Sequence, residues 1–109
     1  MMKLLTITVP SYNSEAYLDR CMATLLPGGD EVEILIVDDG STDRTAEIAD
    51  KYERKYPNIV RAIHKENGGH GDAVTTGIRN ATGLFFKVVD SDDSLAPEAY
   101  KQVLDFLRR

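Results

Sequence analysis

The sequence predicts an α/β fold that is doubly wound, with a mostly parallel, four-stranded sheet and helices on both of its faces. Four short apolar segments have the length and composition of buried strands: residues 3–9, 33–37, 59–64 and 84–89. Each runs into a polar turn and then into a segment with apolar residues at helical spacing: residues 15–26, 42–56, 71–81 and 97–107. Strands that alternate with helices pair in parallel through right-handed crossovers, because a tight hairpin cannot join parallel strands.

Prolines mark the ends of the first two strand and helix pairs. Pro10 follows the first strand, and Pro27 with two glycines ends the first helix. The second strand runs into an aspartate-rich turn, in which Ser41 or Thr42 is expected to cap the second helix. Pro57 ends that helix.

The second half of the chain repeats the pattern. After the third strand, a glycine turn over residues 67–69 leads into a helix with Ala73 and Ile78 on one face, and Gly83 ends it. Pro97 suits the first turn of the last helix, since its missing N–H has no partner there in any case.

The composition excludes several classes of protein. With 42% hydrophobic and 28% charged residues among 109, the chain can form one small domain with a packed core, so disorder and fibrous repeats are excluded. The net charge is −5 and the basic residues are scattered, which argues against a nucleic-acid partner. Cys21 lies in an apolar helical stripe and is expected to be a buried thiol. We find no membrane segment and no signal peptide, and we expect a cytoplasmic protein.

Acidic residues gather in the loops after the second and fourth strands. In doubly wound sheets, ligands bind at the carboxyl ends of the strands, where such loops meet. We expect five carboxylates to crowd the mouth of one crevice there: Asp38, Asp39, Asp90, Asp92 and Asp93. Carboxylates so close repel one another unless a hard cation binds among them, and Mg²⁺ or Mn²⁺ would suit this site. Asp90 and Asp92 project to the same side of an extended segment and are predicted to bind one metal ion, or a metal ion and a ribose.

Other residues at these strand ends suggest a nucleotide. A carboxylate such as Asp38 or Asp39 can accept a hydrogen bond from a base or a ribose hydroxyl. Tyr12 either stacks on a base or packs within the protein. His70 either contacts the ligand or is an ordinary surface histidine, and Lys87, which interrupts the fourth strand, either reaches the rim or pairs with an acid.

Four motifs in order resemble those of the inverting family-2 glycosyltransferases, which have the GT-A fold. They are Val9-Pro10-Ser11-Tyr12-Asn13, Ile36-Val37-Asp38-Asp39-Gly40-Ser41-Thr42-Asp43, Asn67-Gly68-Gly69 through Gly77, and Val89-Asp90-Ser91-Asp92-Asp93. The resemblance implies that Pro10 and Tyr12 line a base pocket and that Asp39, together with Asp38, binds the base or ribose. It also implies that Asp90-Ser91-Asp92 is the family's DxD motif, with Asp92 as a direct ligand of Mg²⁺ or Mn²⁺.

The function that the resemblance implies is transfer of a sugar from a nucleoside-diphosphate donor to an acceptor hydroxyl. A UDP-sugar is the family's commonest donor, and the acceptor would be a glycan or a lipid-linked sugar in polysaccharide or cell-surface glycan synthesis. A complete catalytic domain of this type is about twice as long, so we expect residues 1–109 to be its donor-binding half, truncated before the general base, which would lie beyond Arg109. The complete protein could then be attached to the cytoplasmic face of a membrane.

Three alternatives come from other classes. Residues 33–39 resemble the first strand and acidic pair of a phosphorylation receiver, but here a strand and a helix precede that pair. A nucleotidyltransferase would carry a glycine-rich basic loop after the first strand, where this chain has Pro10-Ser11-Tyr12-Asn13. A non-catalytic module that binds nucleotide sugars stays open.

Overall fold

The computed structural model describes residues 2–109 and contains a four-stranded sheet with the order β3-β2-β1-β4. All of its neighbouring strands are parallel. The strands are β1 (Leu5–Ser11), β2 (Val32–Asp39), β3 (Val60–Lys65) and β4 (Phe85–Val88). The predicted parallel α/β sheet is therefore confirmed.

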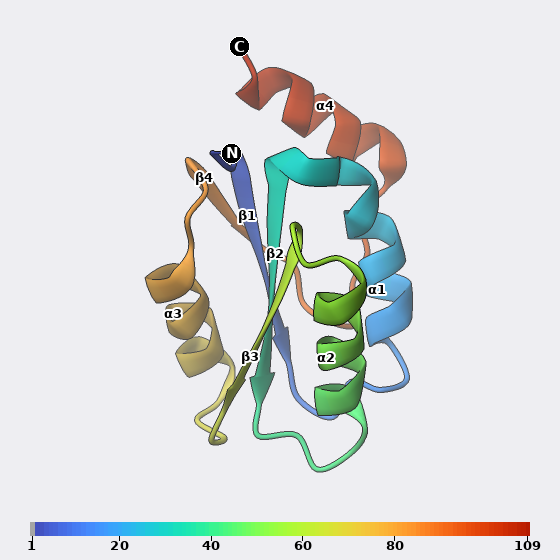
Figure 1. The fold of residues 1–109 in the computed structure, drawn as a ribbon, viewed down its shortest axis with the longest axis vertical. Coiled ribbons are helices and arrows are strands. Elements are labelled where there is room, and N and C mark those ends of the chain that lie inside the picture. Colours follow the sequence, from blue (N-terminus) through green and yellow to red (C-terminus); the bar gives the residue numbers. More distant parts are fainter. Residues whose placement is uncertain (1) are drawn as a thin grey trace.

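Helices cover both faces of the sheet, as the sequence predicts. They are α1 (Leu18–Leu25), α2 (Thr45–Lys55), α3 (His70–Asn80) and α4 (Pro97–Leu107), with a short 3-10 helix η1 (Leu26–Glu31) before β2. Figure 1 shows α1 and α2 on one face and α3 on the other, with α4 beside η1 at the end of the sheet where the strands begin. Within residues 2–109, no helix has the length and apolarity that a membrane span requires.

The alternation of side chains along β2 divides the core between the two faces. Ile34 and Ile36 belong to the large cluster under α1, α2 and α4, whereas Leu35 and Val37 pack with Ala73 of α3. All five are fully buried, and each aliphatic side chain larger than alanine stabilises the fold by about 1.5–3 kcal/mol. Because successive side chains of a strand point to opposite faces, the two residues that end β2 also diverge.

Two helices begin three residues later than the sequence predicts. Residues 15–17 form a turn, in which Ser14 accepts the backbone N–H groups of Tyr17 and Leu18, so α1 starts at Leu18. The predicted cap of α2 at Ser41 or Thr42 is wrong. Arg44 stands at the N-cap and its side chain makes no capping bond, while the carboxylate of the preceding Asp43 accepts both the N–H and the hydroxyl of Thr45, at 2.9 and 2.6 Å.

Strand β4 lies at one edge of the sheet and pairs with β1. Its side chains are largely exposed on both faces, with Phe85 and Lys87 on one and Phe86 on the other. Of the two alternatives for Lys87, pairing with an acid is not seen: the side chain is exposed on the edge strand and makes no ion pair among residues 2–109.

Candidate functional site

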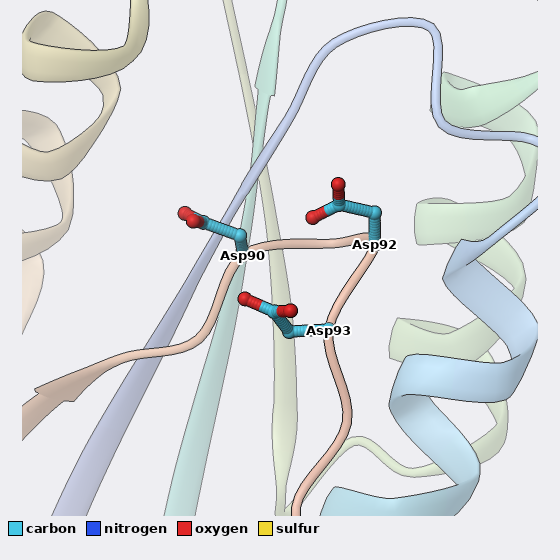
Figure 2. A group of neighbouring side chains, drawn as sticks. All are labelled: Asp90, Asp92 and Asp93. Carbon is cyan, nitrogen blue, oxygen red and sulfur yellow. The ribbon is translucent and has the colours of Figure 1, made fainter.

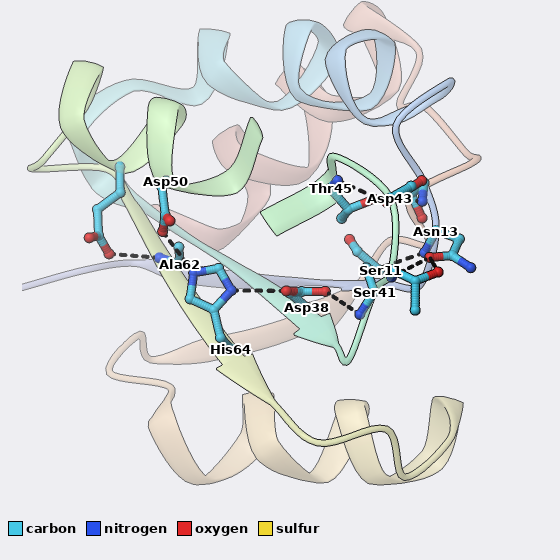
Figure 3. Close-up of polar contacts among 12 residues, drawn as sticks. Ser11, Asn13, Asp38, Ser41, Asp43, Thr45, Asp50, Ala62 and His64 are labelled. Atoms are coloured by element: carbon cyan, nitrogen blue, oxygen red, sulfur yellow. Dashed lines mark hydrogen bonds and ion pairs between the residues drawn. The ribbon is translucent and has the colours of Figure 1, made fainter. Parts of the chain in front are cut away.

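The loops that follow β1 and β2 are joined by hydrogen bonds at the carboxyl end of the sheet. The backbone N–H of Asn13 donates to Ser41 Oγ at 3.0 Å, and Asn13 Oδ1 accepts the N–H of Thr42 at 2.8 Å (Figure 3). Asn13 adopts a left-handed conformation with φ of 50°, which asparagine tolerates better than most residues. These bonds hold the neighbouring Tyr12 loop against the rest of the site.

Two adjoining pockets lie at this end of the sheet. The first has a volume of about 260 Å³ and is lined by residues from β1, β2 and the start of α3, including Pro10, Tyr12 and Asp39. The second has a volume of about 320 Å³ and is lined by Asp90, Ser91 and Asp92 together with the β1 loop. They share three lining residues: Pro10, Tyr12 and His70. We call the two pockets together the crevice.

The loop after β4 carries three carboxylates that lie close together. Figure 2 shows Asp90, Asp92 and Asp93 on this loop, and one oxygen of each lies within 4.8 Å of the others. The carboxylates of Asp92 and Asp93 are exposed and accept no hydrogen bond from a side chain of residues 2–109. Oxygen donors of this kind suit Mg²⁺ or Mn²⁺, so the three residues fit the predicted cation.

Buried hydrogen bonds hold the acidic loop in place. Ser91 lies between the aspartates and points inward, where its hydroxyl bonds that of Ser14 at 2.6 Å. The N–H of Ser14 in turn donates to Thr45 Oγ1 at 2.8 Å. On the same side, the thiol of Cys21 lies 3.8 Å from the carbonyl oxygen of Asp90, and burial with the nearby acids raises its pKa to about 12. The prediction of a buried thiol is therefore confirmed.

Asp39 faces the crevice, but protein groups occupy its carboxylate. Its two oxygens accept the Nζ–H of Lys65 at 2.8 Å and the backbone N–H groups of Gly68 and Gly69 at 2.8 and 2.9 Å. Although burial alone would raise the pKa of Asp39, these donors hold it below its usual value. Asn67 Nδ2 adds a donor to the Asp39 carbonyl at 3.0 Å. Asp39 thus anchors the loop between β3 and α3.

Asp38 lies apart from the crevice, contrary to the expected gathering of five acids. It points to the α2 face, where Oδ1 accepts the N–H of Ser41 at 3.0 Å and Oδ2 lies 2.9 Å from His64 Nδ1 (Figure 3). His64 Nε2 lies 2.7 Å from Asp50 of α2, and the hydrogen bonds to Asp50 and Asp38 raise the pKa of His64. The sequence ended the strand at Val37, whereas β2 continues through Asp39 and its pleat separates the two aspartates.

His70 is a crevice residue that sequence reasoning did not assign. It begins α3, lines both pockets, and its Nε2 lies 2.7 Å from Asp90 Oδ1. The sequence shows that His70 follows two glycines at the start of a helix. It does not show that His70 lies near Asp90, because that contact depends on how the crossover from β3 to β4 is placed in the fold.

A hollow of about 590 Å³ also lies between α1 and α2. Its lining is mainly charged and carries both signs: Glu15, Asp19, Arg44, Glu47, Ile48, Asp50, Lys51 and Arg54. It holds none of the four motifs, and we place the functional site at the crevice.

The sequence profile of the family described as "Glycosyl transferase family 2" matches residues 6–109. The chain belongs to this family. A family-2 relative, the uncharacterized glycosyltransferase EpsJ of Bacillus subtilis, is 37% identical over 106 residues, which are 96% of this chain and 30% of EpsJ. The chain thus spans about a third of the relatives' length.

Solved glycosyltransferases share the fold. The crystal structure of S. aureus TarS 1–349 in complex with UDP-GlcNAc superposes with a TM-score of 0.84 at 32% identity, covering 96% of this chain and 31% of that one. The mannosyltransferase PcManGT from Pyrobaculum calidifontis, in complex with GDP-Man and Mn²⁺, also has a TM-score of 0.84 and covers all of this chain and 33% of its own. At 23% identity, that likeness concerns the fold alone. The predicted GT-A architecture is confirmed.

Family membership overturns the receiver and nucleotidyltransferase alternatives. The strand order also argues against a receiver. In a receiver, with the order 2-1-3-4-5, the first strand lies between the second and the third, whereas here β1 lies between β2 and β4.

Proposed function

We propose that this chain is the donor-binding part of a glycosyltransferase that transfers a sugar from a nucleoside diphosphate to an acceptor hydroxyl in glycan synthesis. The observation that carries the proposal is the crevice, in which the pocket at Asp39 shares Pro10, Tyr12 and His70 with the pocket that the acidic loop lines. Such an arrangement suits a nucleoside diphosphate, because a base can stack on an aromatic side chain and a diphosphate binds a cation held by carboxylates.

The pocket at Pro10, Tyr12 and Asp39 suits the nucleoside. Tyr12 is 52% exposed and can stack on a base, while Pro10 supplies an apolar wall. Asp39 holds the loop that forms the opposite wall, and any direct bond from its carboxylate to the base or ribose would have to be shared with its present donors. We keep UDP as the expected nucleotide, because TarS was crystallised with UDP-GlcNAc.

Asp90 and Asp92 are the residues proposed to hold Mg²⁺ or Mn²⁺, with Asp93 close enough to contribute. A bound cation would supply charge neutralisation for the departing nucleoside diphosphate. The chain's own part is to orient the donor: the bond between Ser14 and Ser91 holds the acidic loop, and the Asn13 bonds hold the Tyr12 loop. Preorganised groups of this kind lower the barrier because they need no rearrangement during the reaction.

Calorimetric titration tests the proposal. UDP and GDP are titrated into the chain with Mn²⁺ or with EDTA, and the parent is compared with Asp92→Asn. We expect binding of one nucleotide in Mn²⁺, and a loss of about tenfold or more in the variant, as for removal of one charged ligand.

The controls separate the parts of the proposal. Arg79→Ala removes an exposed charge at the far end of α3 and is expected to bind like the parent. Binding that is equally tight in EDTA and in Asp92→Asn would overturn the metal role. Failure of the parent to bind either nucleotide would overturn the donor-site proposal itself, whereas nucleotide binding by a full-length protein that transfers no sugar would indicate the non-catalytic module.

A further inference from the structure

We propose that His70 binds the diphosphate of the donor, donating a hydrogen bond from Nε2 to a phosphate oxygen. This inference rests on the proposed donor site and adds a residue to it. In the four motifs, His70 follows the glycine pair but had no assigned role.

The position of His70 matches that of a diphosphate between a nucleoside and a cation. It is one of three residues that line both pockets, so it stands at their junction. Its side chain is 64% exposed, and its Nε2 reaches the acidic loop at Asp90. A ligand that extends from the Tyr12 pocket to Asp92 therefore passes the imidazole.

His70 is the one basic side chain among the residues that line the crevice. Among the residues that line the two pockets, none is lysine or arginine, and His70 is the only histidine. Lys65 is bonded to Asp39, which lines the first pocket, and to Asp72, but Lys65 itself lines neither pocket. A diphosphate has several anionic oxygens and is placed beside carboxylates, so a donor side chain facing it reduces the repulsion.

The contact with Asp90 shows that Nε2 can act as a donor toward this space. The 2.7 Å separation requires a proton between Nε2 and the Asp90 carboxylate, and the neutral imidazole with Nε2–H suffices. A cation bound by Asp90 would compete with this N–H for the carboxylate, so the N–H could donate instead to a phosphate oxygen beside that cation. Asp90 thus holds the imidazole in orientation before the donor binds.

The test compares four proteins: the parent chain, His70→Ala, His70→Gln and Arg79→Ala. UDP and GDP are titrated calorimetrically in Mn²⁺, and the nucleotide that the parent binds is used for the variants. The matching nucleoside is measured by ligand-observed NMR in Mg²⁺, and Mn²⁺ alone by electron paramagnetic resonance. These arms separate contact with phosphate from contact with the base and from an effect on the cation.

We expect His70→Ala to bind the nucleoside diphosphate about tenfold to a hundredfold more weakly, as for loss of a hydrogen bond to a charged group. His70→Gln is expected to recover most of this loss, because its amide nitrogen can donate from nearly the same position. Nucleoside binding by His70→Ala and all binding by Arg79→Ala should equal those of the parent, and Mn²⁺ binding by His70→Ala should be no weaker, because the imidazole no longer competes for Asp90.

Three outcomes would overturn the inference while leaving the donor site intact. They are equal nucleotide affinity in His70→Ala, an equal loss for the nucleoside, and a matching loss for Mn²⁺ alone. Failure of the parent to bind either nucleotide would overturn the donor site and the inference together.

Discussion

Replacing Asp39 by asparagine should destabilise the fold even in the absence of nucleotide. The carboxylate is nearly fully buried and accepts hydrogen bonds from Lys65, Gly68 and Gly69. Asparagine keeps one acceptor oxygen but turns an amide N–H₂ toward the other donors. One backbone N–H, at Gly68 or Gly69, is then left without an acceptor.

The magnitude follows from these bonds. A donor left unsatisfied costs about 1–3 kcal/mol, and the remaining bonds lose the strengthening that a charged acceptor provides. Because Lys65 keeps its bond to Asp72, it is not left as an unpaired charge. We therefore expect a loss of about 2–3 kcal/mol in the free energy of unfolding, a substantial part of the ~5–15 kcal/mol typical of a domain.

Urea unfolding followed by circular dichroism in EDTA measures this loss. The matched control is Asp92→Asn, the same chemical change at an exposed carboxylate, and it should stay within about 0.5 kcal/mol of the parent. If Asp39→Asn were as stable as Asp92→Asn, the carboxylate would not anchor the loop, and the reasoning from its bonds would be refuted.

Two further predictions concern stability. Asp50 and Asp38 raise the pKa of His64 in the folded protein above its unfolded value of about 6.5. The stabilisation from His64 should therefore be fully present below pH 6.5 and be lost as the pH rises through the folded pKa. Urea unfolding midpoints measured against pH should fall over this range in the parent, and His64→Gln should lack the fall. Gly77→Ala should destabilise by about 1–2 kcal/mol despite its better helix propensity, because the added Cβ would lie 2.3 Å from Thr8 Cγ2 and Oγ1. Adding Thr8→Ala removes Oγ1 and Cγ2 but leaves Cβ at 2.8 Å, so it should recover part of the lost stability in the same urea assay; a double variant no more stable than Gly77→Ala would contradict the predicted overlap with Thr8.

The sequence predicted the order and type of the main elements well, because proline and glycine mark the ends of most of them. The last helix runs from Pro97 to Leu107 as predicted, since proline at the first helical position fixes its start. The 3-10 helix η1 was missed, because the apolar spacing ends at Leu26 and a turn of proline and glycines reads simply as a helix stop.

The site was harder to predict, because it depends on strand register. Both Asp38 and Asp39 were assigned to one loop, but Ser11 pairs with Asp38 and Lys65 with Asp39, so both belong to β2 and point to opposite faces. A polar residue at the end of a strand gives no local signal of pairing. The meeting of His70 with Asp90 likewise joins the start of α3 to the loop after β4, 20 residues apart in the sequence.

Because β4 is an exposed edge strand, the charge of Lys87 affects how this edge can pair with another strand. An edge strand presents unpaired backbone groups, and the exposed aromatic side chains of Phe85 and Phe86, which precede Lys87 in β4, would favour docking of a second edge. A lysine within the strand opposes this, because pairing would bring its charge against the incoming chain and strip it of water. Within residues 2–109, the charge of Lys87 therefore opposes edge-to-edge pairing of two copies of this chain at β4.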